Sequence, residues 1–194
     1  EGGKPSVDFL LNQGVQFTLD DDEQLHLTRE GGHSQRRIIH SADATGKAIS
    51  TTLLQRAKER DNITIFENYI AIDLITSQKL GLEEQNRALG LYTLDEKTEK
   101  VHTFLAPFTA LACGGAMKAY LYTSNPDIAT GDGIAMAFRA GCRVANMEFN
   151  QFHPTCLYHP KARSFLITEA MRGEGAYLRL PDGERFMLRL DERA

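Results

Sequence analysis

The segment Gln151-Phe152-His153-Pro154-Thr155 carries polar side chains that could hold a small anion. Side chains alternate along an extended chain, so Gln151 and His153 are expected to point to the same side. Two hydrogen-bonding groups would then face one cavity. For this segment taken alone, the alternative is a histidine whose polar atoms are satisfied within ordinary packing.

A second segment, Thr168-Glu169-Ala170-Met171-Arg172, combines a hydroxyl, a carboxylate and a guanidinium within about one helical turn. Thr168 and Glu169 stand where a helix is expected to begin, and the free backbone amides at a helix start can bind an anion. Arg172 adds a positive charge one turn later. A capped helix with a surface salt bridge accounts for the same residues equally well.

The spacing of apolar residues predicts the elements that position these segments. Helices are expected at residues 5–14, at 45–60 and directly after Gly131-Asp132-Gly133, and Gly14 is a natural helix stop. Runs rich in β-branched and aromatic residues predict strands at 63–66, 69–75, 87–93, 100–106 and 108–113, with a hairpin turn at 95–97. Helices combined with an antiparallel excursion and a final buried strand are typical of an α/β fold.

Glycine and charged residues gather in the connections between these elements. Residues 20–24 predict a surface turn, and residues 27–37 predict a loop that is either flexible or wrapped on a ligand. The last predicted strand runs into Gly114-Gly115-Ala116, ahead of the third helix. Glycines between a strand and a helix let the backbone approach a phosphate or a ring closely.

The composition is that of an ordinary globular protein, with 42% hydrophobic residues, 25% charged residues and a net charge of −4. The charges are interspersed, so no nucleic-acid-binding surface is indicated. Cys113, Cys142 and Cys156 lack metal-ligand spacing and favour free, mostly buried thiols in a reducing compartment. No apolar run reaches the roughly 20 residues that cross a bilayer, and no signal peptide is evident at residues 1–15. We expect a cytoplasmic protein.

Together, the two polar segments and Gly131-Asp132-Gly133 resemble the flavoprotein family of succinate dehydrogenase, fumarate reductase and L-aspartate oxidase. The resemblance covers nearly the whole chain. Ala42-Asp43-Ala44-Thr45-Gly46 is similar to the family's Ala-Asp-x-Thr-Gly helix entry. Ala112-Cys113-Gly114-Gly115-Ala116 is similar to its Ala-Thr-Gly-Gly-Ala turn, with a cysteine in place of the threonine. Residues 26–34 and 143–153 match the L-aspartate oxidase branch of this family.

This resemblance implies the second portion of a Rossmann-like FAD-binding domain at residues 1–146 and the start of an α+β capping domain at 147–194. FAD would be bound non-covalently, with contacts at Ala71, Gly114, Gly115 and Asp132. No metal ion is implied.

The resemblance also implies that His153 and Thr168 hydrogen-bond a substrate carboxylate. Gln151 and Glu169 would line the same pocket and orient those partners, with Arg172 behind them. In the implied reaction a hydride passes from L-aspartate to flavin N5, and oxygen or fumarate reoxidises the flavin. The product, iminoaspartate, is the precursor of quinolinate in NAD biosynthesis, which would couple the enzyme to quinolinate synthase.

Aspartate differs from succinate by an ammonium group, and an ammonium buried without a counter-charge costs several kcal/mol. An acidic side chain should therefore meet it. Glu30, which precedes Gly31-Gly32 in the 27–37 loop, is the candidate. A solvated loop carboxylate is the ordinary role of such a glutamate and remains the alternative.

Two parts that the family requires are not found in this sequence. No Gly-x-Gly-x-x-Gly turn follows an opening strand, so the pyrophosphate turn is expected before Glu1. The catalytic arginine is expected after Ala194. A chain that begins at Glu1 and stops on charged residues is expected to be an internal fragment that alone binds FAD weakly or not at all and does not turn over. A flavin spectrum retained after desalting this chain would contradict that expectation.

Two alternatives stay open at this point. The first is a fumarate reductase or succinate dehydrogenase flavoprotein, which would share His153, Thr168 and Glu169 but not the need for Glu30. The second is a non-catalytic binding or assembly module that keeps the same fold. Against it, the candidate site residues in this chain are complete.

Overall fold

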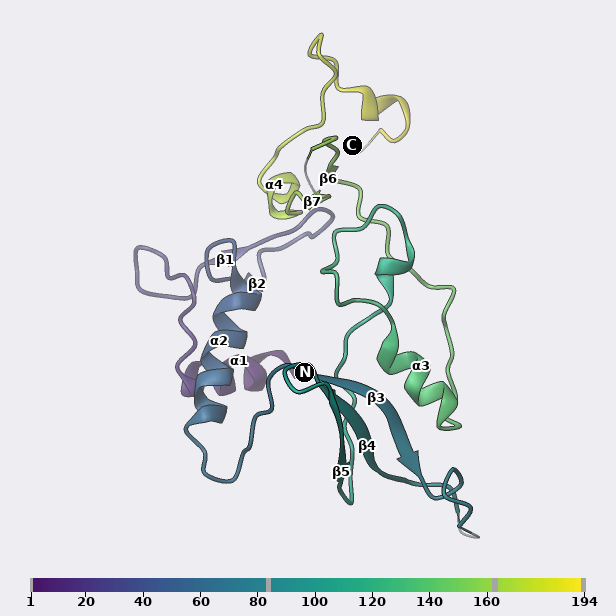
Figure 1. Cartoon of the computed structure of the whole chain (residues 1–194). Helices are drawn as coiled ribbons and strands as arrows, with labels where there is room; N and C mark the ends of the chain where they lie inside the picture. Colours follow the sequence, from purple (N-terminus) through teal and green to yellow (C-terminus); the bar gives the residue numbers. More distant parts are fainter. Residues whose placement is uncertain (1, 83–84, 162–163, 193–194) are drawn as a thin grey trace. The chain divides into compact units, whose positions relative to one another are not determined.

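The computed structural model in Figure 1 describes residues 2–82, 85–161 and 164–192. Contacts divide the chain into two compact units: unit 1 comprises residues 1–65 and 167–194, and unit 2 comprises residues 66–166. The C-terminal segment thus folds together with the N-terminal third of the chain. Glu30 and Thr168 therefore belong to the same unit, although they are distant in sequence.

Unit 1 contains the first two predicted helices. Helix α1 spans Gly3–Gln13 and ends at Gly14, which has a φ of 96° and donates its backbone N–H to the carbonyls of Leu10 and Leu11. A left-handed residue at a helix end is a common stop, and glycine adopts it without strain. Helix α2 spans Thr45–Lys58, and Arg56 on it donates from Nε to the Gln13 carbonyl at 2.8 Å. Both helix predictions are confirmed.

A short hairpin precedes α2 in unit 1. Strand β1 (Leu27–Thr28) pairs antiparallel with strand β2 (Ile38–Ile39), so the prediction of a loop at 27–37 was wrong at its first two residues, which form β1. Strands of two residues are too short to show the alternation that identifies a strand in sequence. The turn predicted at 20–24 is confirmed, because Asp20 Oδ1 accepts hydrogen bonds from the backbone of Asp22 and Gln24. Unit 1 also holds α4 (Ala170–Gly173) and the 3₁₀ helix η2 (Phe186–Arg189).

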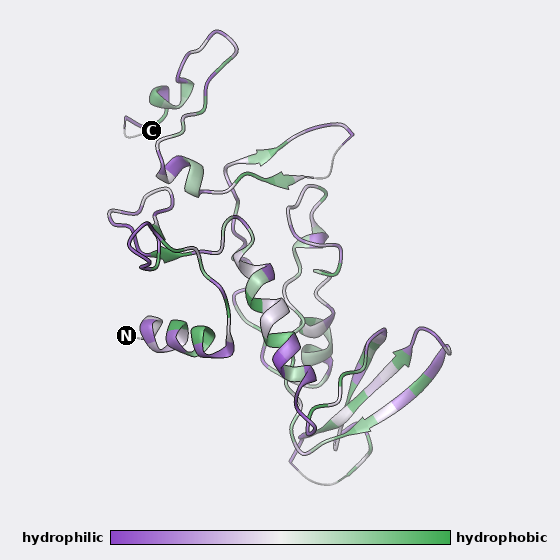
Figure 2. Ribbon diagram, turned by 90° about the vertical axis from the view of Figure 1, so that its left-hand side faces the viewer, coloured by the Kyte–Doolittle hydropathy of each residue, from purple (hydrophilic) through white to green (hydrophobic). Residues whose placement is uncertain are grey.

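Unit 2 is built on an antiparallel three-stranded sheet in the order β3 (Tyr69–Thr76), β4 (Ala88–Asp95) and β5 (Lys100–Leu105). Asp95 closes the predicted β4–β5 turn by accepting from the backbone N–H of Lys97 and the hydroxyl of Thr98. Figure 2 shows both apolar and polar residues along the strands of this sheet. The antiparallel excursion predicted from the sequence is confirmed.

The strands predicted at 63–66 and 108–113 were wrong, because both segments are irregular. Phe66 instead packs against the ring of Phe104, with a centroid distance of 4.8 Å, and Phe108 is 90% exposed. A strand needs a neighbour to satisfy its backbone groups, and no strand among the described residues pairs with either segment. Apolar composition alone does not supply that partner.

The remaining elements of unit 2 are the 3₁₀ helix η1 (Met117–Ala119), α3 (Asp132–Arg139) and the paired short strands β6 (Cys156–Leu157) and β7 (Phe165–Leu166). The third helix prediction is confirmed by α3. Its Met136 is buried, as are Leu74 and Ile75 of β3.

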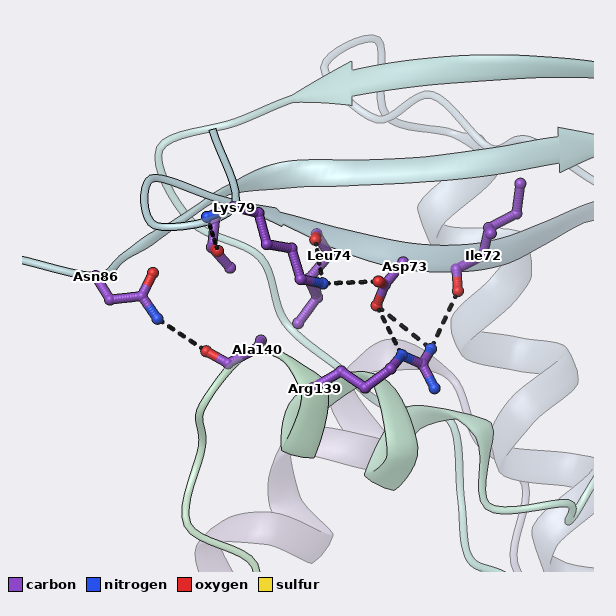
Figure 3. A network of polar contacts seen from close by, with 8 residues as sticks. Ile72, Asp73, Leu74, Lys79, Asn86, Arg139 and Ala140 are labelled. Carbon is purple, nitrogen blue, oxygen red and sulfur yellow. Dashed lines mark hydrogen bonds and ion pairs between the residues drawn. The ribbon is translucent and has the colours of Figure 1, made fainter. Parts of the chain in front are cut away.

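Polar contacts fix α3 to the sheet (Figure 3). Arg139 on α3 reaches Asp73 of β3 at 3.3 Å, and its Nη2 donates to the Ile72 carbonyl at 3.4 Å. Lys79 approaches the other oxygen of the Asp73 carboxylate at 2.6 Å. These two cations lower the pKa of Asp73, and the hydrogen bond from Lys79 is the largest cause. The Asp73 carboxylate thus joins β3, the following turn and α3.

Replacing Asp73 by asparagine is expected to lower the free energy of unfolding of the full-length protein at neutral pH by about 1 kcal/mol, the scale of a partly exposed ion pair. Because the folded-state pKa of Asp73 lies below its ordinary value of 3.8, its contribution is present above that pH and is lost as the pH falls through the folded-state value. Denaturant titrations of both proteins should therefore converge in acid. A difference that stayed constant from neutral to acid pH would contradict this role.

The cysteines are free thiols as expected, but the expectation that they are mostly buried was wrong, since all three are exposed. None of the described helices is both long enough and apolar enough to cross a membrane. The domain boundary expected at 146/147 stays a prediction.

Candidate substrate and cofactor site

Gln151 and His153 line one cavity of unit 2, of about 260 Å³. The segment is extended, and the intervening Phe152, 86% exposed, also borders the cavity. The expectation that both polar side chains face one hollow is therefore met within this unit. A hollow of this size could take part of a small dicarboxylate.

His153 is half-buried, and its Nδ1 accepts a hydrogen bond from the backbone N–H of Thr155 at 3.3 Å. A ring nitrogen that accepts carries no proton, so the neutral ring has its proton on Nε2. Thr155 is 8% exposed, so the backbone that orients the ring is itself held in place. In this tautomer the hydrogen-bond donor of the His153 ring is Nε2–H.

Sequence reasoning missed other polar residues of this cavity. Asn150 Nδ2 donates to the hydroxyl of Tyr120 at 2.9 Å, which links the segment before His153 to the end of η1. Ser124 and Asn125 also line the cavity. The run of hydroxyl and amide side chains at 122–125 was the available signal, but nothing local indicates that it lies beside residue 151.

In unit 1, the segment from Thr168 begins a helix, as predicted, although α4 is a single turn. Thr168 is exposed, and its hydroxyl oxygen accepts from the backbone N–H of Ala170 at 3.3 Å. Glu169 and Arg172 form an ion pair of 2.8 Å, with both side chains about one-third exposed or less. The salt bridge of the alternative reading is therefore present, whereas the N-cap residue Glu169 makes no side-chain capping hydrogen bond and Thr168 forms a short turn to Ala170 instead. In this turn the Thr168 hydroxyl acts as an acceptor, and its proton points elsewhere.

The Glu30 loop lies directly against α4. Gly173 is buried, and a Cβ atom added to it would lie 2.0 Å from the Arg29 carbonyl oxygen. The Arg29 side chain also donates a hydrogen bond from Nε to the Gly173 carbonyl at 2.8 Å. On the other side of Glu30, a Cβ on Gly31 would lie 3.3 Å from the Arg172 guanidinium carbon. The structure thus brings Glu30 to the segment of Thr168, Glu169 and Arg172.

The glycine turn at 114–115 lies beside the start of α3. The backbone N–H of Gly131 donates to the Gly115 carbonyl at 3.1 Å, and a Cβ on Gly133 would lie 2.9 Å from Cys113 Sγ. By contrast, nothing lies within 4 Å of a Cβ placed on Gly114 or Gly115. The turn is thus attached to the start of α3 through the Gly115 carbonyl, whereas the space beside the Cα atoms of Gly114 and Gly115 is open.

The chain is similar to known proteins over its whole length. The model of the family described as FAD binding domain matches residues 1–194. The chain belongs to the FAD binding domain family. It is 85% identical, over its whole length, to the L-aspartate oxidase of Acinetobacter baylyi, of which it covers 36%, and 60% identical to that of Pseudomonas aeruginosa, of which it covers 37%. The chain therefore spans little more than a third of the length of these relatives.

The fold also matches solved structures. E. coli quinol fumarate reductase FrdA superposes with a TM-score of 0.84 and 29% identity, over 95% of this chain and 30% of that one. The α/β fold expected from the sequence, that of the succinate dehydrogenase and fumarate reductase flavoproteins, is confirmed.

In this FAD binding domain, the open backbone at Gly114 and Gly115 fits a cofactor that approaches the chain closely. Asp132 is exposed at the start of α3, where its Oδ2 accepts from the Thr130 hydroxyl at 2.8 Å. Ala71 lies in β3 opposite Thr93, next to a register shift that ends at Asp73. FAD is the cofactor of the family, and these residues are compatible with holding it.

Proposed function

We propose that this chain is part of an FAD-dependent L-aspartate oxidase that converts L-aspartate to iminoaspartate and passes the electrons to oxygen or fumarate. The observation that carries the proposal is the contact of the Glu30 loop with α4, supported by the L-aspartate oxidases that match the whole chain. A site for aspartate needs groups for a carboxylate and a counter-charge for the ammonium. In unit 1, Thr168 would serve the carboxylate and Glu30 the ammonium, and the segments that carry these two residues contact each other.

In this proposal His153 and Thr168 donate hydrogen bonds to carboxylate oxygens of the substrate, from Nε2 and from the hydroxyl. Hydrogen bonds to a charged acceptor are about twice as strong as neutral ones. Gln151 lines the cavity beside His153, and Glu169 holds Arg172 in place through their ion pair. Glu30 receives the ammonium group. These roles orient the Cα–H bond of the substrate.

FAD, when bound, accepts the hydride released from the substrate. This chain would contribute the backbone at Ala71 and at Gly114–Gly115, together with Asp132, to hold it. The base that removes the substrate proton is not among the residues assigned above. We also propose that the product is delivered to quinolinate synthase and that the protein is cytoplasmic.

The second candidate is fumarate reduction or succinate oxidation, favoured by the match to quinol fumarate reductase FrdA. Both reactions need the carboxylate-binding residues His153 and Thr168. Only an amino acid substrate needs Glu30, so this residue separates the two candidates.

The proposal is tested on the full-length protein loaded with FAD. With L-aspartate and oxygen it should release ammonia and oxaloacetate, the hydrolysis products of iminoaspartate, and succinate should be a much poorer electron donor. Efficient oxidation of succinate without turnover of L-aspartate would establish the second candidate instead.

A further inference from the structure

The loop that carries Glu30 has a second attachment to α4, at the far end of the loop from Arg29. Arg36 Nη1 and Nη2 donate to the two carboxylate oxygens of Glu174, at 2.8 and 2.7 Å. Glu174 directly follows Gly173, the residue that touches Arg29. Arg36 Nη1 also lies 3.3 Å from the carbonyl oxygen of Leu27 in β1. One guanidinium thus joins the hairpin at the base of the loop to the end of α4.

The Arg36–Glu174 contact is a fork of two parallel hydrogen bonds, a geometry that fixes the orientation of both groups. The pKa of Glu174 is lowered, chiefly by the hydrogen bond from Arg36, and the pKa of Arg36 is raised by the same contact. Both side chains are about half exposed. An exposed pair of this kind contributes little to overall stability.

At this place, such a pair can control the position of the Glu30 loop on α4 more than the stability of the fold. Glu30 lies between two contacts with α4: the Arg29 backbone is close to Gly173, and Gly31 is close to the side chain of Arg172. Among the described residues, the other contacts of the loop with α4 lie at Arg29 and Gly31, directly beside Glu30. Loss of the Arg36–Glu174 fork would therefore remove the attachment of the far end of the loop to α4. In a binding site, a misplacement of about 1 Å can cost roughly 100-fold in rate. A weak surface ion pair can therefore have a larger effect on substrate choice than on folding.

We propose that Arg36 and Glu174 are positioning residues for substrate selectivity, whose fork closes the Glu30 loop onto α4 and fixes Glu30 relative to Thr168. The inference rests on the proposed function, since it assigns the fork to the ammonium side of the aspartate site. It adds a selectivity element that touches neither substrate nor cofactor. Loss of the fork weakens recognition of an amino acid and spares recognition of a plain dicarboxylate.

The test compares L-aspartate oxidation with fumarate reduction in the full-length FAD-loaded protein. In Arg36→Ala and in Glu174→Ala, kcat/KM for L-aspartate should fall by about 3- to 10-fold, mainly through KM, while that for fumarate changes by less than about twofold. The double variant Arg36→Glu with Glu174→Arg restores the pair in reverse and should regain most of the loss. Raised salt, which screens exposed charges, should increase the L-aspartate KM of the wild type but not that of Arg36→Ala.

The chain offers a matched control in the same unit. Arg189 makes a similar exposed fork with Glu184, so Arg189→Ala removes the same kind of interaction away from the loop and should leave both activities unchanged. Should the reversed pair fail to fold, Arg36→Lys, which keeps the charge but loses the fork, is expected to fall between the wild type and Arg36→Ala. Equal losses on both substrates, or no loss on L-aspartate, would overturn the positioning role and leave the proposed function standing. A wild type that does not oxidise L-aspartate would remove both.

Discussion

Replacing His153 by alanine in the full-length FAD-loaded protein lowers kcat/KM for L-aspartate by roughly 100- to 1,000-fold, the usual cost of removing one positioned donor from an active site. The donor is the Nε2–H, which the hydrogen bond from the Thr155 backbone to Nδ1 leaves in place. Because the proposed role of His153 is to bind a substrate carboxylate, which fumarate shares, fumarate reduction should fall to a similar extent. FAD content and the unfolding midpoint stay near those of the wild type, and steady-state kinetics with both substrates measure the effect.

The sequence contains a close control for this substitution. His159 also precedes a proline, and its Nδ1 also accepts from the backbone N–H two residues on, that of Lys161, at 3.1 Å. His159 is exposed and does not line the cavity that holds His153. His159→Ala therefore removes the same local hydrogen bond without the donor to the substrate. Comparable losses in the two variants would show that His153 acts only through its local backbone contact.

Replacing Glu30 by glutamine lowers kcat/KM for L-aspartate by about 100-fold, close to 3 kcal/mol, the scale expected when a buried charged group loses its partner. Glutamine keeps the shape of the side chain and removes the negative charge. Fumarate carries no ammonium, so its reduction changes by less than about threefold, the scale of an uncharged contact. The ratio of the two losses, measured in one enzyme preparation, is the informative quantity.

Glu96, an exposed residue of the β4–β5 turn, provides the control for removal of one negative charge. Glu96→Gln should leave both activities as they are. If Glu30→Gln weakens L-aspartate oxidation and fumarate reduction to the same degree, the ammonium role is lost and Glu30 is an ordinary loop carboxylate.

Local chemistry explains why much of the fold was predictable. Gly14 stops α1 because it adopts a left-handed conformation, and Asp95 closes its turn with its own carboxylate. The apolar spacing of α2 and the β-rich run of β3 likewise depend on neighbours a few residues away. In each case the interacting groups are close in sequence.

Long-range partners explain what was missed. The apolar run at 108–113 has the composition of a strand, but no described strand pairs with it. The attachment of Arg36 to Glu174 joins residues 138 positions apart, and that of Arg29 to Gly173 joins residues 144 apart. Glu30 could be proposed from the ammonium it would have to meet. The contacts that hold it on α4 have no local signature in the sequence.

Anaerobic titration of the full-length FAD-loaded protein with L-aspartate tests whether the proposed site takes an amino acid and passes its hydride to FAD. L-aspartate should bleach the oxidised flavin spectrum, the Glu30→Gln variant should need far more L-aspartate for the same bleaching, and added fumarate should restore the colour. A flavin that stays oxidised in saturating L-aspartate but is bleached by succinate would contradict it.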